Sequence, residues 1–469
     1  MKQDTPRFDA LLASLLLLLT VCVLARLVTA DFAALETLNN AIAVAARISF
    51  VLLCMFGLPV CSLREKILLS ATVVLGLCLL AQTGSPRILA EAIDLAAFFG
   101  VFIAMLTVMK EAATRSRSVA EVGIYLTSQP PGRRFYSVAI GAHILGAFLN
   151  FSAVSLISPL IQKGAKASTS EPSKDLERRQ LSALIRGFSW ILLWAPTTLT
   201  QAVLLSLFAD INYTRLITLG LISSLLMIGI GRIFDRIEWP NRSIRPTVKK
   251  VTFPAISFLV VTAVCGLLLL ATYLTKFLAG FSIAQSLMFI APAITLAWLA
   301  AQRFVQKDVP DGVENIPQIF SLAAPNLTRS AIALGLSGFI GRVAANILPT
   351  SDIANWFSTA DVPGWVFLAA LPIIITLGGQ IALSPIVFVV FLGQIITTFP
   401  IMPADPTLIV FSLSVGWALS MTASPNATAT LLISATCNIP PTTLTWRWNA
   451  RYALACYLVF VLIFYLLGP

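Results

Sequence analysis

The sequence predicts an all-α polytopic membrane protein, with about 11 transmembrane helices and two opposed re-entrant hairpins in an inverted repeat. The chain of 469 residues is 58% hydrophobic and only 11% charged, whereas soluble domains carry about 25% charged residues. Apolar stretches of about 20 residues, the length that crosses a bilayer, recur from residue 9 to the C-terminus. Two further apolar stretches, 135–161 and 364–398, are each flanked on both sides by segments with a similar content of lysine and arginine. This favours a hairpin over a crossing helix.

The predicted spans follow from length and hydropathy. They cover residues 9–29, 41–61, 67–83, 93–109, 183–208, 214–231, 252–275, 283–302, 325–347, 406–434 and 450–467. The first is followed by further spans and by no small-residue cleavage site, so we expect a retained helix rather than a signal peptide. The seven cysteines lie mostly in apolar runs without metal-ligand spacing, so we expect small core residues.

Lysine and arginine predict the orientation, because cytoplasmic loops collect positive charge. With the N-terminus inside, only Arg87, Arg215 and Lys276 fall in external loops. The net charge of +11 therefore indicates topology, and we expect no nucleic-acid partner. The expected location is the bacterial inner membrane, with the lipid bilayer around the chain and a cytoplasmic N-terminus. The charged segment 163–180 is interpreted as a solvated cytoplasmic linker.

The stretch 135–161 is the first predicted hairpin. Basic residues crowd both 110–134 and 163–186, so a single crossing would carry one cluster to the outside. Counting membrane crossings from the cytoplasmic N-terminus places both ends of the stretch 364–398 outside, so this stretch is the second predicted hairpin. Non-helical backbone at membrane depth persists only inside protein or beside water, so the two hairpins predict a central site.

A polar interruption follows each hairpin. Pro196 lies among threonines after a tryptophan, and Pro425 lies among serine and threonine residues after another. Proline removes a backbone donor and interrupts a helix. The two prolines are 229 residues apart, and the same offset relates Asn150 to Gly379. Inverted repeats with interrupted midplane helices are the layout of secondary transporters; taken singly, each cluster could also be a simple kink.

The layout resembles the ion transporter superfamily, most closely its divalent anion/sodium symporters, and also arsenite-pump and citrate-carrier relatives. The stretch GAFLNFSAVSLISPL (146–160) is similar to the hairpin-tip pattern of that superfamily, and SPNAT (424–428) resembles its penultimate-helix break. The resemblance implies a carboxylate-like anion as substrate, sodium as coupling ion, elevator-type alternating access and a homodimer. The Ser-Asn-Thr triplet of the divalent-anion branch is absent, and Asn150 replaces the tip carboxylate of arsenite-pump-like relatives. Substrate identity, coupling ion (sodium, proton or none) and transport direction therefore stay open.

Carried over residue by residue, the resemblance implies a substrate- and ion-binding site made of two hairpin tips and two helix breaks. It implies as members Asn150, Ser152, Thr197, Thr198, Gly378, Gly379, Ser384, Ser424, Asn426 and Thr428. The prolines that interrupt the two helices, Pro196 and Pro425, complete the predicted site.

Two further residues have alternative interpretations. His143, the only histidine, lies in the first hairpin and either senses cytoplasmic pH or bonds a neighbouring hairpin carbonyl. Arg342 lies inside a predicted span, where an unpaired arginine costs about 3 kcal/mol or more. It either attracts the anion, or snorkels or binds helix carbonyls.

The repeat divides the chain into parts with expected roles. Scaffold helices are expected in 1–134 and 252–363, and transport parts in 135–210 and 364–434. A sixth helix with a cytoplasmic linker is expected in 211–251, and a terminal helix in 435–469.

Enzyme chemistry finds no support in the motifs. The sequence contains no Gly-rich phosphate loop, Walker-type lysine or zinc-ligand cluster, and we find no carboxylate in mid-membrane. We therefore expect a transporter, not an enzyme, with no resident cofactor or metal apart from sodium as coupling ion. The alternative is an uncoupled anion exporter or channel on the same scaffold.

Overall fold

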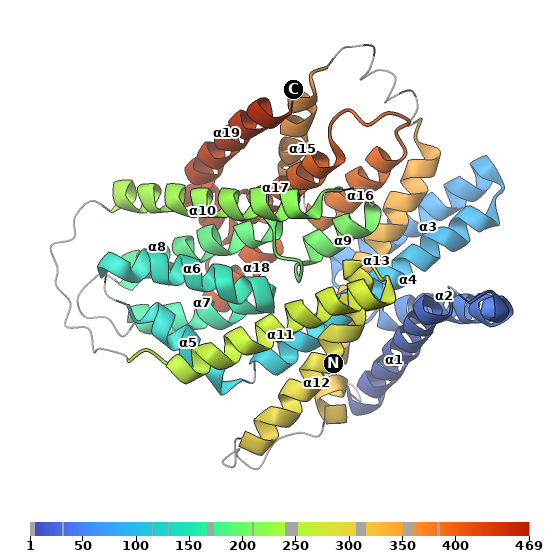
Figure 1. Ribbon diagram of the computed structural model, residues 1–469, viewed down its shortest axis with the longest axis horizontal. Helices are drawn as coiled ribbons and strands as arrows, with labels where there is room; N and C mark the ends of the chain where they lie inside the picture. The colour runs from blue at the N-terminus through green and yellow to red at the C-terminus, as the bar shows by residue number, and fades with distance from the viewer. Residues whose placement is uncertain are drawn as a thin grey trace. The chain divides into compact units, whose positions relative to one another are not determined.

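The computed structural model describes residues 5–30, 32–114, 116–129, 131–166, 173–208, 211–239, 252–305, 316–349, 362–381 and 385–468, with the single residues 352 and 359. Every regular element in this part of the chain is a helix, as Figure 1 shows. The all-α prediction is confirmed.

Ten helical segments of the described chain are long and apolar enough to cross a membrane, so the chain is an integral membrane protein. They are α1 (Thr5–Thr29), α2 (Glu36–Gly57), α3 (Leu63–Thr83), α4 (Pro86–Thr114), α10 (Tyr213–Glu238), α11 (Ala255–Ala279), α12 (Ile283–Val305), α13 (Ile316–Ile347), the interrupted pair α17 (Pro406–Ala423) and α18 (Thr428–Cys437), and α19 (Ala450–Leu467).

The predicted span 183–208 is also interrupted. It comprises the end of α8 (Ser173–Phe188), the short 3-10 helix η2 (Ser189–Leu193) and α9 (Leu199–Leu207). A helix with a break of this kind does not meet the length of a continuous span, although its residues are apolar.

The first predicted hairpin is present as α6 (Pro131–Leu149) and α7 (Phe151–Lys166), joined by Asn150 alone. Asn150 has a φ of +52°, in the left-handed region that asparagine tolerates better than most residues. The amphipathic helix α5 (Arg117–Thr127) packs against both arms. We call α6, Asn150 and α7 hairpin 1.

Hairpin 2 consists of α15 (Gly364–Gly378), the 3-10 turn η3 (Gly379–Ile381) and α16 (Pro385–Thr397). Its two helices have 15 and 13 residues, too few for either to cross a bilayer alone. The arms approach closely near the tip, since a Cβ on Gly378 would lie 2.3 Å from the Phe388 ring. After α18 comes the π-helix η4 (Thr443–Arg447).

The prediction of a solvated linker in 163–180 holds in part for its described residues, because Lys163, Gly164, Lys166, Lys174 and Asp175 are exposed but the described residues are helical. Hairpin 1 continues as helix to Lys166, and α8 begins at Ser173. Arg179 and Gln180 are buried, because they face neighbouring helices rather than water. The predicted helix 214–231 is also too short, since α10 continues to Glu238.

The chain forms two compact units. The first comprises residues 1–112, 267–352 and 390–399, and the second comprises 113–266, 353–389 and 400–469. In the first unit α1 packs on α2 and α13, and α3 packs on α13. In the second unit α6 and α7 pack on α8, while α17 packs on η2, α9 and α15. The scaffold and transport roles expected for parts of the chain stay predictions.

Candidate functional site

The first helix break, residues 194–198, separates η2 from α9. Pro196 cannot donate a backbone hydrogen bond, so the helical ladder stops here. The chain turns instead, with the Thr198 backbone N–H donating to the Ala195 carbonyl at 3.0 Å. The helix then restarts, with Thr198 as N-cap accepting from the Gln201 N–H at 3.5 Å. We call residues 194–198 break 1.

The second helix break, residues 424–427, repeats the same backbone pattern. The Ala427 N–H donates to the Ser424 carbonyl at 3.2 Å, and the Leu431 N–H donates to the Ala427 carbonyl at 2.9 Å. The corresponding bonds in break 1 run from Thr198 to Ala195 and from Ala202 to Thr198, each displaced by 229 residues. The repeat seen in the sequence is therefore a repeat of local structure. We call residues 424–427 break 2.

Each break is hydrogen-bonded to its own hairpin. In the first repeat the Thr197 hydroxyl donates to the Ala147 carbonyl, near the end of α6. In the second, the Asn426 amide donates to the Gly379 carbonyl at 3.0 Å and to the Gln380 carbonyl at 3.3 Å. Tip and break therefore form one structure in each repeat.

The tip of hairpin 2 is further secured by side chains. The Ser424 hydroxyl donates to the Gly379 carbonyl at 2.6 Å, and the Gln380 amide donates to the Ala423 carbonyl at 3.2 Å. The Trp446 indole, from η4, donates to the Gln380 side-chain oxygen at 3.0 Å. Because both polar groups of Gln380 are engaged, the tip is held by its own protein partners.

Hairpin 1 and α9 contain buried side-chain oxygens that have no partner among the described residues, namely those of Asn150, Ser152, Thr200 and Gln201. In hairpin 2 the Thr376 hydroxyl is likewise without one. A buried polar group without a partner costs about 1–3 kcal/mol, so such groups mark where a ligand or water fits the protein. The contact between Thr197 and Ala147 joins the two chain segments that carry them.

Thr200 and Gln201 are absent from the predicted site. Gln201 is 1% exposed, and its amide donates to the Leu192 carbonyl at 2.8 Å and the Ser414 hydroxyl at 3.0 Å. Those bonds hold the side chain across break 1 and against α17. The signal in the sequence was a single glutamine within an apolar run, which is unusual because burying an amide requires partners.

His143 links hairpin 1 to both sides of η2. Its Nδ1 lies 2.9 Å from the Gly187 carbonyl oxygen in α8, and its Nε2 lies 3.0 Å from the Trp194 indole nitrogen. The carbonyl it binds therefore belongs to α8, not to the hairpin itself. A Cβ on Gly187 would lie 2.1 Å from the Ala139 carbonyl oxygen, so only glycine allows α6 and α8 to approach this closely.

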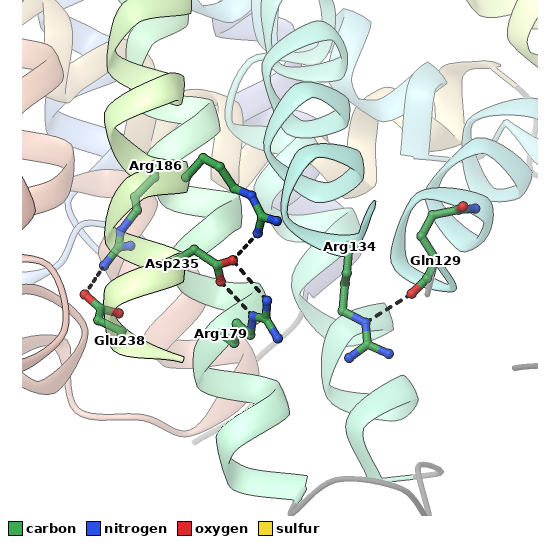
Figure 2. A network of polar contacts seen from close by, with 7 residues as sticks. Gln129, Arg134, Arg179, Arg186, Asp235 and Glu238 are labelled. Carbon is green, nitrogen blue, oxygen red and sulfur yellow. Dashed lines mark hydrogen bonds and ion pairs between the residues drawn. The ribbon is translucent and has the colours of Figure 1, made fainter. Parts of the chain in front are cut away.

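An arginine–carboxylate network holds α8 against α10 (Figure 2). Arg179 donates two hydrogen bonds to Asp235, at 2.7 and 3.0 Å, and Arg232 pairs with the same carboxylate. Arg186 binds Glu238 at 2.9 Å and the Asn449 side chain at 2.8 Å. Asp235 is absent from the predicted site, because residues beyond 231 are assigned to a linker on the sequence. The network fixes the helix that leads into break 1.

The remaining predicted residues lie as follows. Arg342 belongs to the first unit, where its guanidinium donates to Glu91 at 2.7 Å, so the charge has a carboxylate partner. Ser384 lies outside the described residues. Thr428 begins α18 directly after break 2, and Pro425 is buried within that break.

Comparison with known proteins identifies the fold but no sequence family. No family model and no curated protein matches the sequence. The YdaH transporter of Alcanivorax borkumensis matches with a TM-score of 0.57 and 16% identity, over 90% of this chain and 99% of that one. MtrF of Neisseria gonorrhoeae, from a class of antimetabolite efflux pumps, matches with a TM-score of 0.58 and 12% identity, over 87% of this chain and 97% of that one. At these identities the likeness establishes a shared fold, while the likeness to divalent anion/sodium symporters stays a prediction.

Proposed function

We propose that the chain is a secondary active transporter of a small, carboxylate-like anion. The observation that supports this most directly is the repeated unit of hairpin tip and helix break. Interrupted helices with this pattern place backbone groups and helix ends at membrane depth, where secondary transporters bind substrate. The shared fold with the YdaH transporter and the MtrF efflux pump supports transport rather than enzyme catalysis.

The two breaks offer complementary chemistry to an anion. Helices α9 and α18 both begin at a break, with Thr198 and Ala427 as their N-caps. A helix N-terminus carries partial positive charge and unpaired N–H groups. An anionic group between the breaks would therefore be stabilised without a nearby lysine or arginine, which accords with the pairing of Arg342 to Glu91 elsewhere.

Hairpin 1 and α9 offer different chemistry. The carbonyl oxygens of the Asn150 and Gln201 side chains can only accept hydrogen bonds, and neither has a partner among the described residues. Neutral oxygens of this kind suit a hard monovalent cation. We therefore propose sodium as the coupling ion, bound beside the anion, with these residues and Ser152 as ligands.

The moving part in this proposal is the second compact unit, which contains hairpin 1, both helix breaks and the tip of hairpin 2. The first unit would serve as the scaffold of a homodimer in the inner membrane. Elevator-type movement of the second unit would then carry the whole site across the membrane.

Uptake into proteoliposomes tests the function. Labelled dicarboxylates should accumulate in a saturable way when a sodium gradient is present, and much less when it is absent. Asn150→Ala and Pro425→Ala should abolish uptake, whereas Thr436→Ala, an exposed site on α18, should leave it unchanged. Saturable uptake that does not depend on the sodium gradient would contradict sodium coupling. Normal uptake by both site variants would contradict the proposed binding site.

An uncoupled exporter or channel is the second candidate, suggested by the shared fold with MtrF, which belongs to a class of antimetabolite efflux pumps. Substrate flux that fails to saturate would favour a channel. Counterflow, in which unlabelled substrate on one side drives labelled substrate inward, requires a carrier and separates the two.

A further inference from the structure

Hairpin 1 and break 1 share a second contact, which has no part in the proposed binding of substrate or ion. It is the imidazole of His143, the only histidine of the chain, which is 7% exposed. One ring nitrogen faces the Gly187 carbonyl at 2.9 Å and the other faces the Trp194 indole at 3.0 Å. The two contacts lie before and after η2, so the imidazole bridges the segment that precedes break 1.

The partners determine the protonation of this imidazole. An indole N–H can only donate, so Nε2 must carry a lone pair. A carbonyl oxygen can only accept, so Nδ1 must carry the hydrogen. The ring in this structure is therefore the neutral Nδ1–H tautomer, with both nitrogens in use.

A proton added at Nε2 is incompatible with the Trp194 contact. The new N–H would face the indole N–H, leaving two donors opposed and no acceptor between them. The hydrogen bond from Trp194 to Nε2 is then lost, while the bond from Nδ1 to Gly187 persists.

Trp194 is well placed to transmit this loss. It caps the end of η2, with φ −141° and ψ −29°, outside the helical region. The backbone next to it lies against α10, since a Cβ on Gly220 would be 2.4 Å from the Leu193 carbonyl oxygen and 2.8 Å from Trp194 Cβ. Thr197 and Thr198 lie three and four residues further along the same break, so a shift of Trp194 acts on the residues that bind hairpin 1 and cap α9.

The contacts described for the imidazole include no carboxylate that would stabilise its protonated form. Helix α6 packs against α5, α7, α8, α10 and η2, and η2 itself has no charged residue. The charged residues with described side chains on the other four are Arg117, Glu121, Lys163, Lys166, Lys174, Asp175, Glu177, Arg178, Arg179, Arg186, Arg215, Arg232, Asp235, Arg236 and Glu238. None of the hydrogen bonds described for His143 goes to a carboxylate, and the acids of α10 pair with arginines.

We propose that His143 is a proton-sensitive positioning residue, whose protonation at Nε2 releases Trp194 and so removes one of the two contacts that join break 1 to hairpin 1. The inference concerns the regulation of the proposed transport site and rests on that function. Acidification around hairpin 1 lowers transport, because the break loses the contact that holds its first residue. Uptake falls about tenfold at one pH unit below the imidazole midpoint, since about a tenth of the protein then keeps the neutral ring.

The first experiment reads the imidazole directly and does not require transport. A full-length protein purified through a tag without histidine, and labelled with 15N-histidine, gives a single imidazole in the NMR spectrum. We expect the Nδ1–H tautomer at neutral pH and protonation of Nε2 on acidification. Fluorescence that depends on Trp194, measured as the difference from Trp194→Phe, should change with the same midpoint. An Nε2–H tautomer, or fluorescence that stays constant through the titration, overturns the proposal.

The second experiment separates position from charge. His143→Gln keeps an acceptor for Trp194 and a donor for Gly187 in one side chain but does not titrate, so uptake should persist and lose its decline in acid. Trp194→Phe should lose the same decline, while Trp298→Phe, a buried tryptophan of the first unit, should retain it. A pH profile unchanged in His143→Gln overturns the switch and leaves the transport proposal intact. A titration as expected in a protein that transports no anion overturns the function and leaves the switch intact.

Discussion

Thr197 and Asn426 occupy the same position in the two helix breaks, and each donates a side-chain hydrogen bond to a carbonyl of its own hairpin. Each follows a proline, and the two residues are 229 positions apart. A carbonyl near a hairpin tip lacks the helical N–H that would satisfy it, and in a bilayer each such group costs several kcal/mol. The side chain after the proline supplies a donor to such a carbonyl in both repeats, and in the second repeat the Ser424 hydroxyl donates to the same carbonyl.

Asn426→Ala tests the second of these contacts. The substitution removes the amide that binds the Gly379 and Gln380 carbonyls at 3.0 and 3.3 Å. Gly379 keeps the bond from the Ser424 hydroxyl, so the Gln380 carbonyl is the group that loses its side-chain donor. Losing the partner of a buried polar group costs about 1–3 kcal/mol, so we expect uptake to fall by roughly tenfold or more with normal insertion. Thr436→Ala on the same interrupted span is the control. Equal uptake by the two variants would show that the amide is dispensable.

Gly187→Ala tests the crossing of α6 and α8. The added Cβ would lie 2.1 Å from the Ala139 carbonyl oxygen, which is backbone and cannot turn away. Overpacking of this kind costs about 1–3 kcal/mol, occasionally more, so the detergent-solubilised protein should unfold at a lower temperature. Gly164→Ala is the matched control, because a Cβ there meets nothing within 4 Å. The same melting temperature in both variants would contradict the close crossing.

Asp235→Asn tests the network in Figure 2. Asp235 is 2% exposed and binds Arg179 and Arg232, both of which are buried. Breaking a buried ion pair costs about 3–5 kcal/mol, because an uncompensated charge is left behind. The control is Asp405→Asn, whose exposed pair with Arg215 is 3.3 Å long and is worth at most about 1 kcal/mol. The melting temperature should therefore fall further in Asp235→Asn than in the control. A smaller fall in Asp235→Asn would contradict a stabilising role for the network.

Glu121 predicts a pH dependence of the stability of α5. A hydrogen bond from the Ser257 hydroxyl, followed by one from Arg117, lowers the pKa of this carboxyl from its ordinary 4.5. A pKa lowered by folding gives stability that is complete above the unfolded value and is lost as the pH falls through the folded value. Amide exchange in residues 117–127 should therefore accelerate below the ordinary value. In Glu121→Gln the amide exchange should lose this dependence on pH. If exchange in that variant still accelerates in acid, another group is responsible for the dependence.

The hairpins and breaks were predictable because their signals are local. Pro196 and Pro425 interrupt helices by removing a donor, and Asn150 tolerates the left-handed turn that joins α6 to α7. Basic residues on both sides of hairpin 1 indicated that its ends share a face. Gln201 was missed because one polar residue in an apolar run does not reveal which partners it finds. The end of α10 was misplaced because Arg232 and Arg236 are typical of a cytoplasmic loop. Only the structure shows that Asp235, between them, is buried and paired with arginines.

The sequence by itself determined the membrane class, the positions of most helices, and the repeat of hairpin and break. Those properties depend on the length of apolar runs and on prolines, which act over a few residues. The tertiary structure decided which groups meet. His143 binds Trp194 from 51 residues away, and Arg179 binds Asp235 from 56 residues away. Such pairs form only when helices pack, because a hydrogen bond is selected by the direction and distance of its partner, which the order of residues does not contain.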